Sequence, residues 1–136
     1  MEKTLLLIKP DGVRRGLTGE VLARFERKGY SIASLSMVSA TEELLSEHYI
    51  EHREKPFFPS LVTYMTSGPI VAAVIEGARV IEGVRSVCGA TEPTLAAPGT
   101  IRGDLGRDWG TGQIENIVHS SDSPESAERE ISLWFT

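Results

Sequence analysis

The chain has 136 residues, of which 40% are hydrophobic and 24% are charged, and its formal net charge is −5 at pH 7. This length and this balance are typical of a globular protein with its own core, so we expect residues 1–136 to form a single domain. The acidic charge argues against a general nucleic-acid-binding protein, although a local basic pocket is compatible with it.

Hydrophobic periodicity predicts strands and helices in alternation. A first strand covers 4–8 and stops at Lys9-Pro10-Asp11-Gly12, and a helix capped by Thr18 runs to residue 28. Residues 30–39 alternate like a strand with one polar face. The remaining predicted elements are helices over 41–52, 60–67, 77–88 and 124–134, and short strands over 70–75 and 117–118.

Two segments lack periodicity. Residues 89–104 are rich in glycine, proline and threonine and are predicted to form a functional loop, and residues 105–115 are also predicted to be irregular. The element order β-α-β-(αα)-β-α-loop-β-α predicts an α/β (α+β) ferredoxin-like sandwich. In this fold a four-stranded antiparallel sheet has helices packed on it, here expected on one face, and carries an inserted helical hairpin.

The compartment follows from the N-terminal run and from the cysteine count. Residues 4–8 are too short a run for a signal-peptide core or a membrane span. Cys88 is the only cysteine, which excludes an intrachain disulfide and favours a packed small side chain over a reactive thiol. We expect a cytoplasmic protein with no membrane partner.

His119 ends the last predicted strand, immediately before a helix start. Ser123 is suited to cap that helix and Pro124 to occupy its first position, so backbone N–H groups and the positive end of the helix dipole follow the histidine closely. A phosphoryl group on the imidazole would be stabilised there. On the residues alone, His119 is either such a nucleophile or an ordinary surface or capping histidine.

Glu130 lies about two turns into the same helix, so its carboxylate can face back toward His119. A carboxylate there would accept the ring N–H, fix the tautomer and leave the other nitrogen as the nucleophile.

Three cationic residues are candidates for phosphate binding. Lys9 directly follows a buried run and is expected to point into a cleft at the sheet edge, the alternative being a surface lysine. Arg102 stands beside Gly103 in the long loop and suits bidentate phosphate contacts, and Arg85 on the preceding helix can join it. No glycine-rich motif of the P-loop or Rossmann type occurs in the sequence.

Two further motifs contain aromatic rings. Phe57 and Phe58 are adjacent, so we expect one in the core and the other exposed, where it either stacks on a nucleobase or closes a loop. His48 and His52 share one face of a predicted helix, and we expect solvated histidines there rather than metal ligands.

Seven stretches together resemble the nucleoside diphosphate kinase family over almost the whole chain, and the pattern around His119 is specific to that family. The stretches are Ile8-Lys9-Pro10-Asp11-Gly12, His48-Tyr49, Lys55-Pro56-Phe57-Phe58, Ser67-Gly68-Pro69, Pro98-Gly99-Thr100-Ile101-Arg102-Gly103-Asp104, Asn116-Ile117-Val118-His119 and Ser121-Asp122-Ser123. The resemblance implies transfer of the γ-phosphoryl group from nucleoside triphosphates to nucleoside diphosphates by double displacement, through a phosphohistidine on His119.

The same resemblance implies roles for single residues. Glu130 would hold the ring of His119, with Ser121 in the same hydrogen-bond network, and Lys9 and Tyr49 would act beside them at the catalytic centre. The residues implied to bind the nucleotide are Lys9, Phe57, Arg85, Thr91, Arg102 and Asn116. Mg²⁺ is the implied cofactor, held mainly by the nucleotide phosphates and not by a set of protein ligands.

The implied partners are ATP and other nucleoside di- and triphosphates, no specific nucleic acid, and further copies of the chain in a homo-oligomer, a hexamer rather than a tetramer. Two features depart from the family pattern. The connection 105–115 is longer than usual, and Ser120 replaces a glycine or alanine. The longer connection leaves an alternative function, a catalytically weak nucleotide-binding regulatory member of the same fold.

Overall fold

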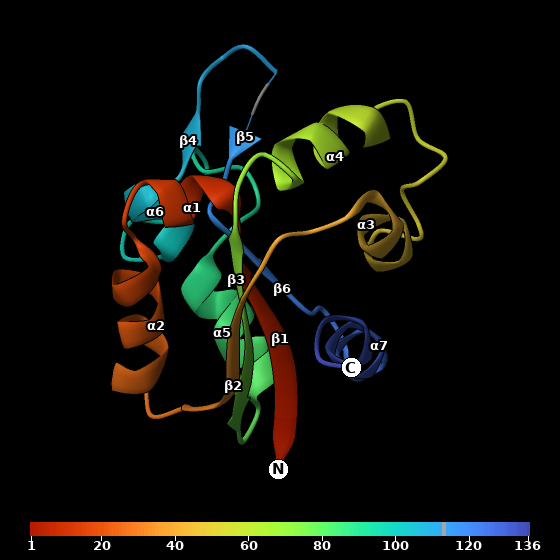
Figure 1. Ribbon diagram of the computed structural model, residues 1–136. Helices are drawn as coiled ribbons and strands as arrows, with labels where there is room; N and C mark the ends of the chain where they lie inside the picture. Colours follow the sequence, from red (N-terminus) through yellow and green to blue (C-terminus); the bar gives the residue numbers. More distant parts are fainter. Residues whose placement is uncertain (113) are drawn as a thin grey trace.

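A four-stranded antiparallel sheet runs through the middle of the computed structural model, which describes residues 1–112 and 114–136 (Figure 1). The strand order is β2-β3-β1-β6. The strands are β1 (Glu2–Ile8), β2 (Ser31–Val38), β3 (Ile70–Gly77) and β6 (Val118–Ser120). The predicted antiparallel sheet of an α+β ferredoxin-like sandwich is confirmed, with the first and last strands as neighbours.

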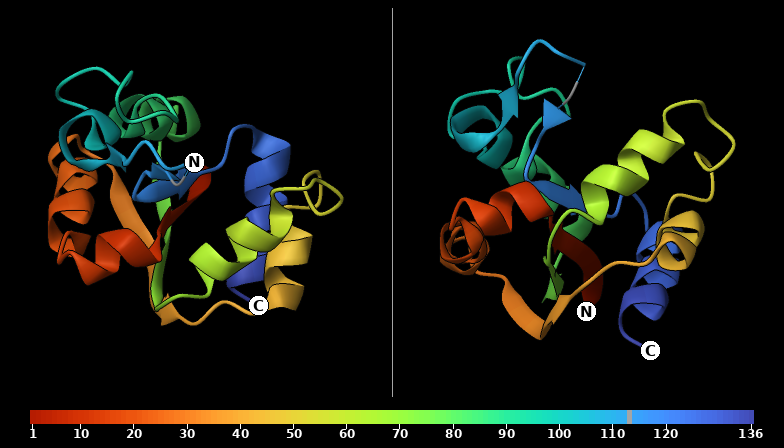
Figure 2. Two further views of the ribbon diagram at one scale, coloured as in Figure 1. Left: turned by 90° about the horizontal axis from the view of Figure 1, so that it is seen from above. Right: turned by 45° about the horizontal axis from the view of Figure 1, so that its top comes forward.

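Helices cover both faces of the sheet, as the two views of Figure 2 show. On one face lie α2 (Thr18–Arg27) and α5 (Val80–Cys88), and on the other lie α3 (Glu42–His48), α4 (Phe58–Met65) and α7 (Pro124–Trp134). The expectation that helices cover one face is therefore wrong.

The core explains why both faces are covered. In β1, Leu6 and Ile8 pack with α2 and α5, while Leu5 and Leu7 pack with α3, α4 and α7. All four side chains are fully buried. A strand with two buried faces needs a continuous apolar run, which is the pattern that residues 4–8 show. Cys88 is also fully buried, as expected of a packed small side chain.

The helix starts agree with the sequence in part. Thr41 caps α3 by accepting the N–H of Leu44 at 3.1 Å, but α3 ends at His48, earlier than predicted. Thr18 is the first residue of α2 and not its cap, since Leu17 precedes the helix without a side-chain cap. The inserted helical hairpin, α3 followed by α4, is confirmed.

The segments expected to be irregular contain short regular elements. The helix α1 (Pro10–Arg14) begins at a proline that suits a first helical position but resembles a stop signal in the sequence. The helix α6 (Ile101–Leu105) is capped by Thr100, and β4 (Arg107–Asp108) pairs with β5 (Ile114–Glu115). The prediction that residues 89–104 and 105–115 lack regular structure is therefore wrong at α6, β4 and β5.

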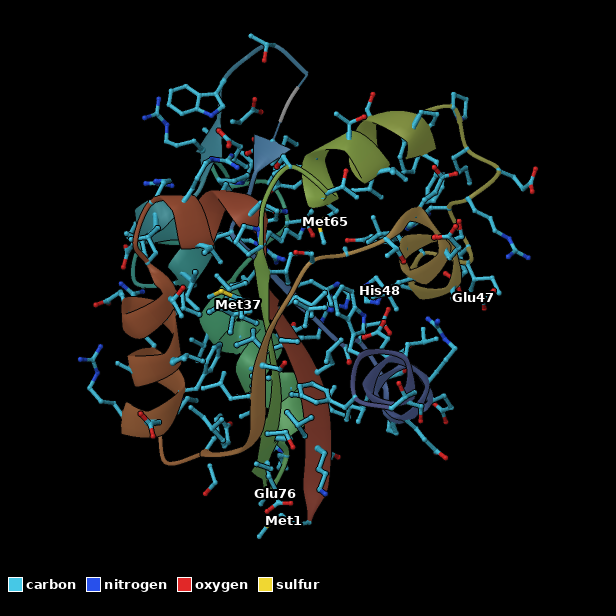
Figure 3. The ribbon with its side chains drawn as sticks, viewed as in Figure 1. Met1, Met37, Glu47, His48, Met65 and Glu76 are labelled. Atoms are coloured by element: carbon cyan, nitrogen blue, oxygen red, sulfur yellow. The ribbon has the colours of Figure 1, made fainter. Side chains whose placement is uncertain are left out.

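The strand β2 forms one edge of the sheet, and neither of its faces is buried. Leu35 and Met37 are 55% and 62% exposed, and Figure 3 labels Met37 on this strand. Of the apolar side chains expected on this strand, Ile32 and Val38 pack against the cores, whereas Leu35 and Met37 are not covered by the described residues. Among the described residues, no helix is long and apolar enough to cross a membrane.

Candidate active site

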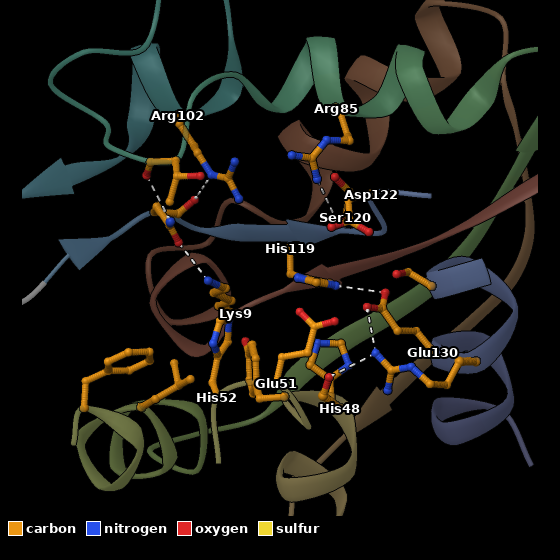
Figure 4. A pocket seen from close by; sticks show the side chains of 17 residues that line it. Lys9, His48, Glu51, His52, Arg85, Arg102, His119, Ser120, Asp122 and Glu130 are labelled. Atoms are coloured by element: carbon orange, nitrogen blue, oxygen red, sulfur yellow. Dashed lines mark hydrogen bonds and ion pairs between the residues drawn. The ribbon is translucent and has the colours of Figure 1, made fainter. Parts of the chain in front are cut away.

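His119 is the middle residue of β6 and pairs with Leu7 of β1. Its side chain is 20% exposed and lines a cleft of about 370 Å³, which Figure 4 shows from close by. Ligand sites of small molecules usually have volumes of roughly 300–1,000 Å³, so the cleft is large enough for one. The sequence-predicted residues Lys9, Tyr49, Phe57, Arg85, Thr91, Arg102, Asn116 and Glu130 line the same cleft.

Glu130 reaches His119 from the first turns of α7. The hydroxyl of Ser123 accepts the N–H of Ser126 at 3.1 Å, so the predicted N-cap is present. The Oε1 atom of Glu130 lies 3.0 Å from Nε2 of His119 and accepts the hydroxyl of Ser121 at 2.7 Å. Ser121 in turn accepts the N–H of Leu5 at 3.2 Å, which ties the network to the central strand.

These contacts fix the tautomer of His119. An ionised carboxylate only accepts hydrogen bonds, so Nε2 carries the proton and the lone pair lies on Nδ1. Burial opposes the charge on Glu130, but the hydrogen bonds from His119 and Ser121 outweigh burial, and the pKa of Glu130 is lowered. Burial also lowers the pKa of His119, against the raising effect of Glu130. The imidazole is therefore neutral at neutral pH, with its nucleophilic nitrogen free.

Cationic side chains lie on two sides of His119. In Figure 4, Arg85 and Arg102 lie above the ring and Lys9 lies below it. The ammonium of Lys9 is nearly buried and donates to Oδ1 of Asn116 at 2.9 Å. Burial, together with the positive charge of Arg102, lowers the pKa of Lys9 to about 8. A buried cation beside a nucleophile favours a polyanionic ligand in this cleft.

Arg102 also organises the backbone around the cleft. Its three nitrogens donate to the carbonyls of Asn116 at 3.3 Å, Gly89 at 2.9 Å and Val118 at 2.5 Å. Burial lowers the pKa of Arg102, but a guanidinium keeps its charge in proteins. Two of its five N–H donors remain for a ligand.

The remaining predicted residues line the wall and the mouth of the cleft. Asn116 donates to the carbonyl of Thr91 at 3.1 Å, which connects the long loop to the strand that carries His119. Burial raises the pKa of Tyr49 well above its usual range, so its hydroxyl stays neutral. Phe57 is 50% exposed and Phe58 is buried. This confirms the expectation that one of the two rings lies in the core and the other is exposed.

Sequence reasoning missed the role of His48 in this site. It is buried, and its Nδ1 accepts the indole N–H of Trp134 at 3.0 Å. Its ring centre lies 4.5 Å from that of His119. The expectation of a solvated histidine at position 48 is wrong, whereas His52 is exposed as expected. The signal was present, because His48 follows Leu45 at the spacing of one apolar helix face.

One group of side chains in the described chain has the donor types of a metal site. Ligand atoms of His48, His119 and Glu130 lie within 4.8 Å of one another. However, an indole nitrogen only donates, so Trp134 forces the proton of His48 onto Nε2, and Nε2 of His119 is already bonded to Glu130. Both histidines therefore lack a free lone pair at this point, and the group does not fit a metal ion.

A family model described as nucleoside diphosphate kinase matches residues 2–136. A nucleoside diphosphate kinase of Archaeoglobus fulgidus is 58% identical over 136 residues, covering 100% of this chain and 87% of the relative. One of Thermus thermophilus is 57% identical over 135 residues, covering 99% and 96%.

The chain belongs to the nucleoside diphosphate kinase family.

Solved structures of this family agree with the fold. A transition-state mimic of a nucleoside diphosphate kinase of Borrelia burgdorferi, with bound vanadate and ADP, has a TM-score of 0.92 and 40% identity, over 99% of this chain and 87% of the other. A halophilic enzyme of Halobacterium salinarum in complex with CDP has a TM-score of 0.91 and 48% identity, over 98% and 87%. As a nucleoside diphosphate kinase, this chain is an enzyme of phosphoryl transfer between nucleotides.

Proposed function

We propose that this nucleoside diphosphate kinase transfers the γ-phosphoryl group through a phosphohistidine on His119. The observation that best supports this is the contact of Glu130 with Nε2 of His119, which leaves Nδ1 free in a cleft lined by four cationic side chains, Lys9, Arg85, Arg102 and Arg129. A neutral ring nitrogen is a nucleophile, and fixed cations offset the charge of the phosphates.

The chemistry has two half-reactions. In the first, the Nδ1 lone pair attacks the γ-phosphorus, and the bond from that phosphorus to the β,γ-bridging oxygen breaks. The nucleoside diphosphate leaves with the bonding electrons, while Glu130 stabilises the positive charge that develops on the ring. In the second, a terminal phosphate oxygen of another nucleoside diphosphate attacks the phosphorus, and the N–P bond breaks to restore neutral His119.

The other cleft residues bind and orient the nucleotide in this proposal. Lys9, Arg85 and Arg102 offset the phosphate charge. The ribose and phosphates are held through Tyr49, Thr91 and Asn116. Phe57 stacks on the base from the mouth of the cleft, and stacking accepts every base because each has an apolar face. We therefore expect little discrimination among nucleobases.

Nucleotide phosphotransfer generally needs a divalent metal, and we propose Mg²⁺ as that metal. Of the three carboxylates that line the cleft, Glu130 is engaged by His119, which leaves Glu51 and Asp122 as oxygen donors. This small donor set fits an ion held mainly by nucleotide phosphates. Mg²⁺ bound in this way would neutralise part of the phosphate charge. Chelation with EDTA is expected to stop turnover, and added Mg²⁺ to restore it.

Labelling with [γ-³²P]ATP tests the role of His119. The wild-type chain is expected to form an acid-labile, alkali-stable phosphoprotein, and His119→Ala to form none. His52→Ala is the matched control, because this histidine is exposed at the cleft mouth outside the hydrogen-bond network, and its label is expected to remain. A wild-type chain that turns over nucleotides without taking up label would refute the phosphohistidine.

The regulatory alternative is not favoured. It rested on the long connection 105–115, which was a candidate to occlude the cleft. None of its described residues, 105–112 and 114–115, lines the cleft. Robust transfer from ATP to a second nucleoside diphosphate is the measurement that separates an enzyme from a binding protein.

We further propose a homo-oligomer, a hexamer rather than a tetramer. The uncovered Leu35 and Met37 on the edge strand β2, together with the exposed Trp109, support self-association. Light scattering on the purified chain measures the copy number directly.

We also propose that residues 1–136 act as one domain in the cytoplasm. The buried, unpaired Cys88 suits a reducing compartment, and cell fractionation tests the location.

A further inference from the structure

Asp11 is a fully buried carboxylate for which the proposed chemistry has no use. It lies in α1, directly after Lys9-Pro10. Its Oδ1 accepts the hydroxyl of Tyr64, and its Oδ2 accepts the N–H of Ile117 at 3.1 Å. Among the described residues no lysine or arginine forms an ion pair with it. A buried carboxylate without a cation is costly, so its two hydrogen bonds call for an explanation.

Ile117 has a backbone conformation that is unfavourable for its residue type. Its φ is +69°, and the N–H of Val118 donates to the carbonyl of Asn116 at 2.7 Å, which closes a three-residue γ-turn around Ile117. A β-branched side chain in the left-handed region is a true outlier, and such strain persists only where the surroundings impose it.

Several neighbours impose this turn. The carbonyl of Ile117 accepts the N–H of Lys9 at 2.7 Å, and a side-chain carbon on Gly12 would lie only 2.9 Å from the Ile117 side chain. Arg102 holds the carbonyls on either side of the turn. The N–H of Ile117 is paired only with Asp11 in the described structure, so Asp11 supplies the contact that no other residue duplicates.

The turn decides which side chains share the cleft. In a regular strand, residues three apart point to opposite faces. Asn116 and His119 are three apart, yet both line the same cleft. The left-handed turn at Ile117 provides the extra rotation, and it thereby brings the partner of Lys9 and the proposed nucleophile to one side.

We propose that Asp11 is a positioning residue for phosphoryl transfer, because its hydrogen bond to Ile117 maintains the turn that brings Asn116 and His119 into the same cleft. The proposal rests on the proposed function of His119. It predicts that Asp11 affects how fast His119 is phosphorylated, and not whether it is.

The experiment measures the single-turnover rate of phosphorylation by ATP and the final stoichiometry of label. Asp11→Ala is expected to slow phosphorylation about 10- to 100-fold, the effect of a misplacement near 1 Å, with unchanged stoichiometry. Tyr64→Phe is the matched control, because it removes the other bond of Asp11 and leaves Ile117 untouched. Its rate is expected to stay within about 3-fold of wild type.

A double-mutant cycle separates positioning from general stability. Glycine adopts positive φ without strain, so in an Ile117→Gly background the loss of Asp11 is expected to change the rate by less than about 3-fold. An equal rate loss in both backgrounds would overturn the proposal. So would rates of Tyr64→Phe and Asp11→Ala that both fall in proportion to their loss of unfolding free energy. Absence of label in the wild type would instead refute the function of His119.

Asp11→Asn keeps the test decisive if Asp11→Ala does not fold. Its amide oxygen can still accept the N–H of Ile117, so the rate is expected to stay within about 10-fold of wild type. The coupling constant between the amide and α protons of Ile117, which reports φ, is expected to be unchanged. A folded Asp11→Asn chain with altered φ at Ile117 and a wild-type rate would contradict the role assigned to the turn.

Discussion

The two edge strands of the sheet, β6 and β2, differ in how far the rest of the chain covers them. In β6, two of three residues are buried, and the carbonyls of Val118 and Ser120 accept hydrogen bonds from Arg102 and Arg85. In β2, six of eight residues are exposed, Leu35 and Met37 among them. An open edge is a template for further pairing, so proteins usually cover or charge it.

This difference shows that one set of residues can serve structure and function together. The arginines that we propose to bind phosphate also occupy two backbone carbonyls of the β6 edge within one chain. The β2 edge has no such cover in the described structure, and we propose that another copy of the chain covers its apolar side chains. Four predictions test this contrast, from the largest expected effect to the smallest.

Arg102→Ala is expected to have the largest effect. The change removes a charge that we propose binds phosphate, together with the hydrogen bonds that Arg102 donates to three backbone carbonyls. We therefore expect kcat/KM to fall about 10³-fold and the free energy of unfolding to fall by about 2 kcal/mol. Steady-state kinetics and urea unfolding measure the two losses. Arg85→Ala is the control, since its one backbone contact is long, at 3.5 Å. If both variants lose the same stability, Arg102 does not complete the edge.

Glu130→Gln is expected to slow phosphorylation of His119 about 10²-fold, because the charge that stabilises the ring is lost. The carboxylate raises the pKa of His119, so the variant should show a still lower pKa for this ring in an NMR titration. Ser121→Ala retains the contact between His119 and Glu130 and should change both quantities less. A pKa of His119 that rises in Glu130→Gln would contradict the assigned hydrogen bond.

Acid is expected to destabilise the β6 side of the sheet through His48. Burial, with the electrostatic effect of the nearby His119 ring, lowers the pKa of His48 from 6.5 to about 3. The unfolded chain therefore binds a proton that the native chain does not between these values, and stability falls as the pH falls below 6.5. The expected loss is roughly 1–2 kcal/mol by about pH 5, measured by urea unfolding. His48→Gln should reduce this pH dependence, and an unchanged slope would exclude His48 as its source.

Met37→Lys is expected to have the smallest effect on chemistry. The charge on the β2 edge should lower the solution mass measured by light scattering, while the single-turnover rate stays within about 2-fold of wild type. Leu95→Lys is the matched control, because Leu95 is 79% exposed but lies outside β2. Loss of the oligomer in both variants would show that the effect is not specific to this edge.

The sequence predicted the features that depend on local spacing. The position of Glu130 in a helix capped by Ser123 placed its carboxylate near His119, and the apolar run 4–8 predicted the first strand. The resemblance supplied the remaining cleft residues, which the structure brings together.

Features that depend on distant contacts were not predictable in this way. The turn at Ile117 depends on Asp11, 106 residues earlier, and the hydrogen bond that fixes the ring of His48 comes from Trp134, 86 residues later. A single sequence shows no sign of either pairing. The side of the sheet that each helix covers was equally hidden, because an apolar strand with two buried faces accepts helices on both.

The pairing of β1 with β6 has a consequence for how the protein is made. The first strand pairs with β3 on one side, but its pairing with β6 on the other side forms only after residue 118 has been synthesised, and Lys9 then meets Asn116 across 107 residues. Contacts at such separation form late, because a long loop must close before they stabilise the chain. Synthesis proceeds from the N-terminus, so a nascent chain on the ribosome holds Lys9, Arg85 and Arg102 before it holds the histidine. Products truncated before His119 would therefore lack phosphotransfer activity, and the chain becomes active only after its last strand has been added.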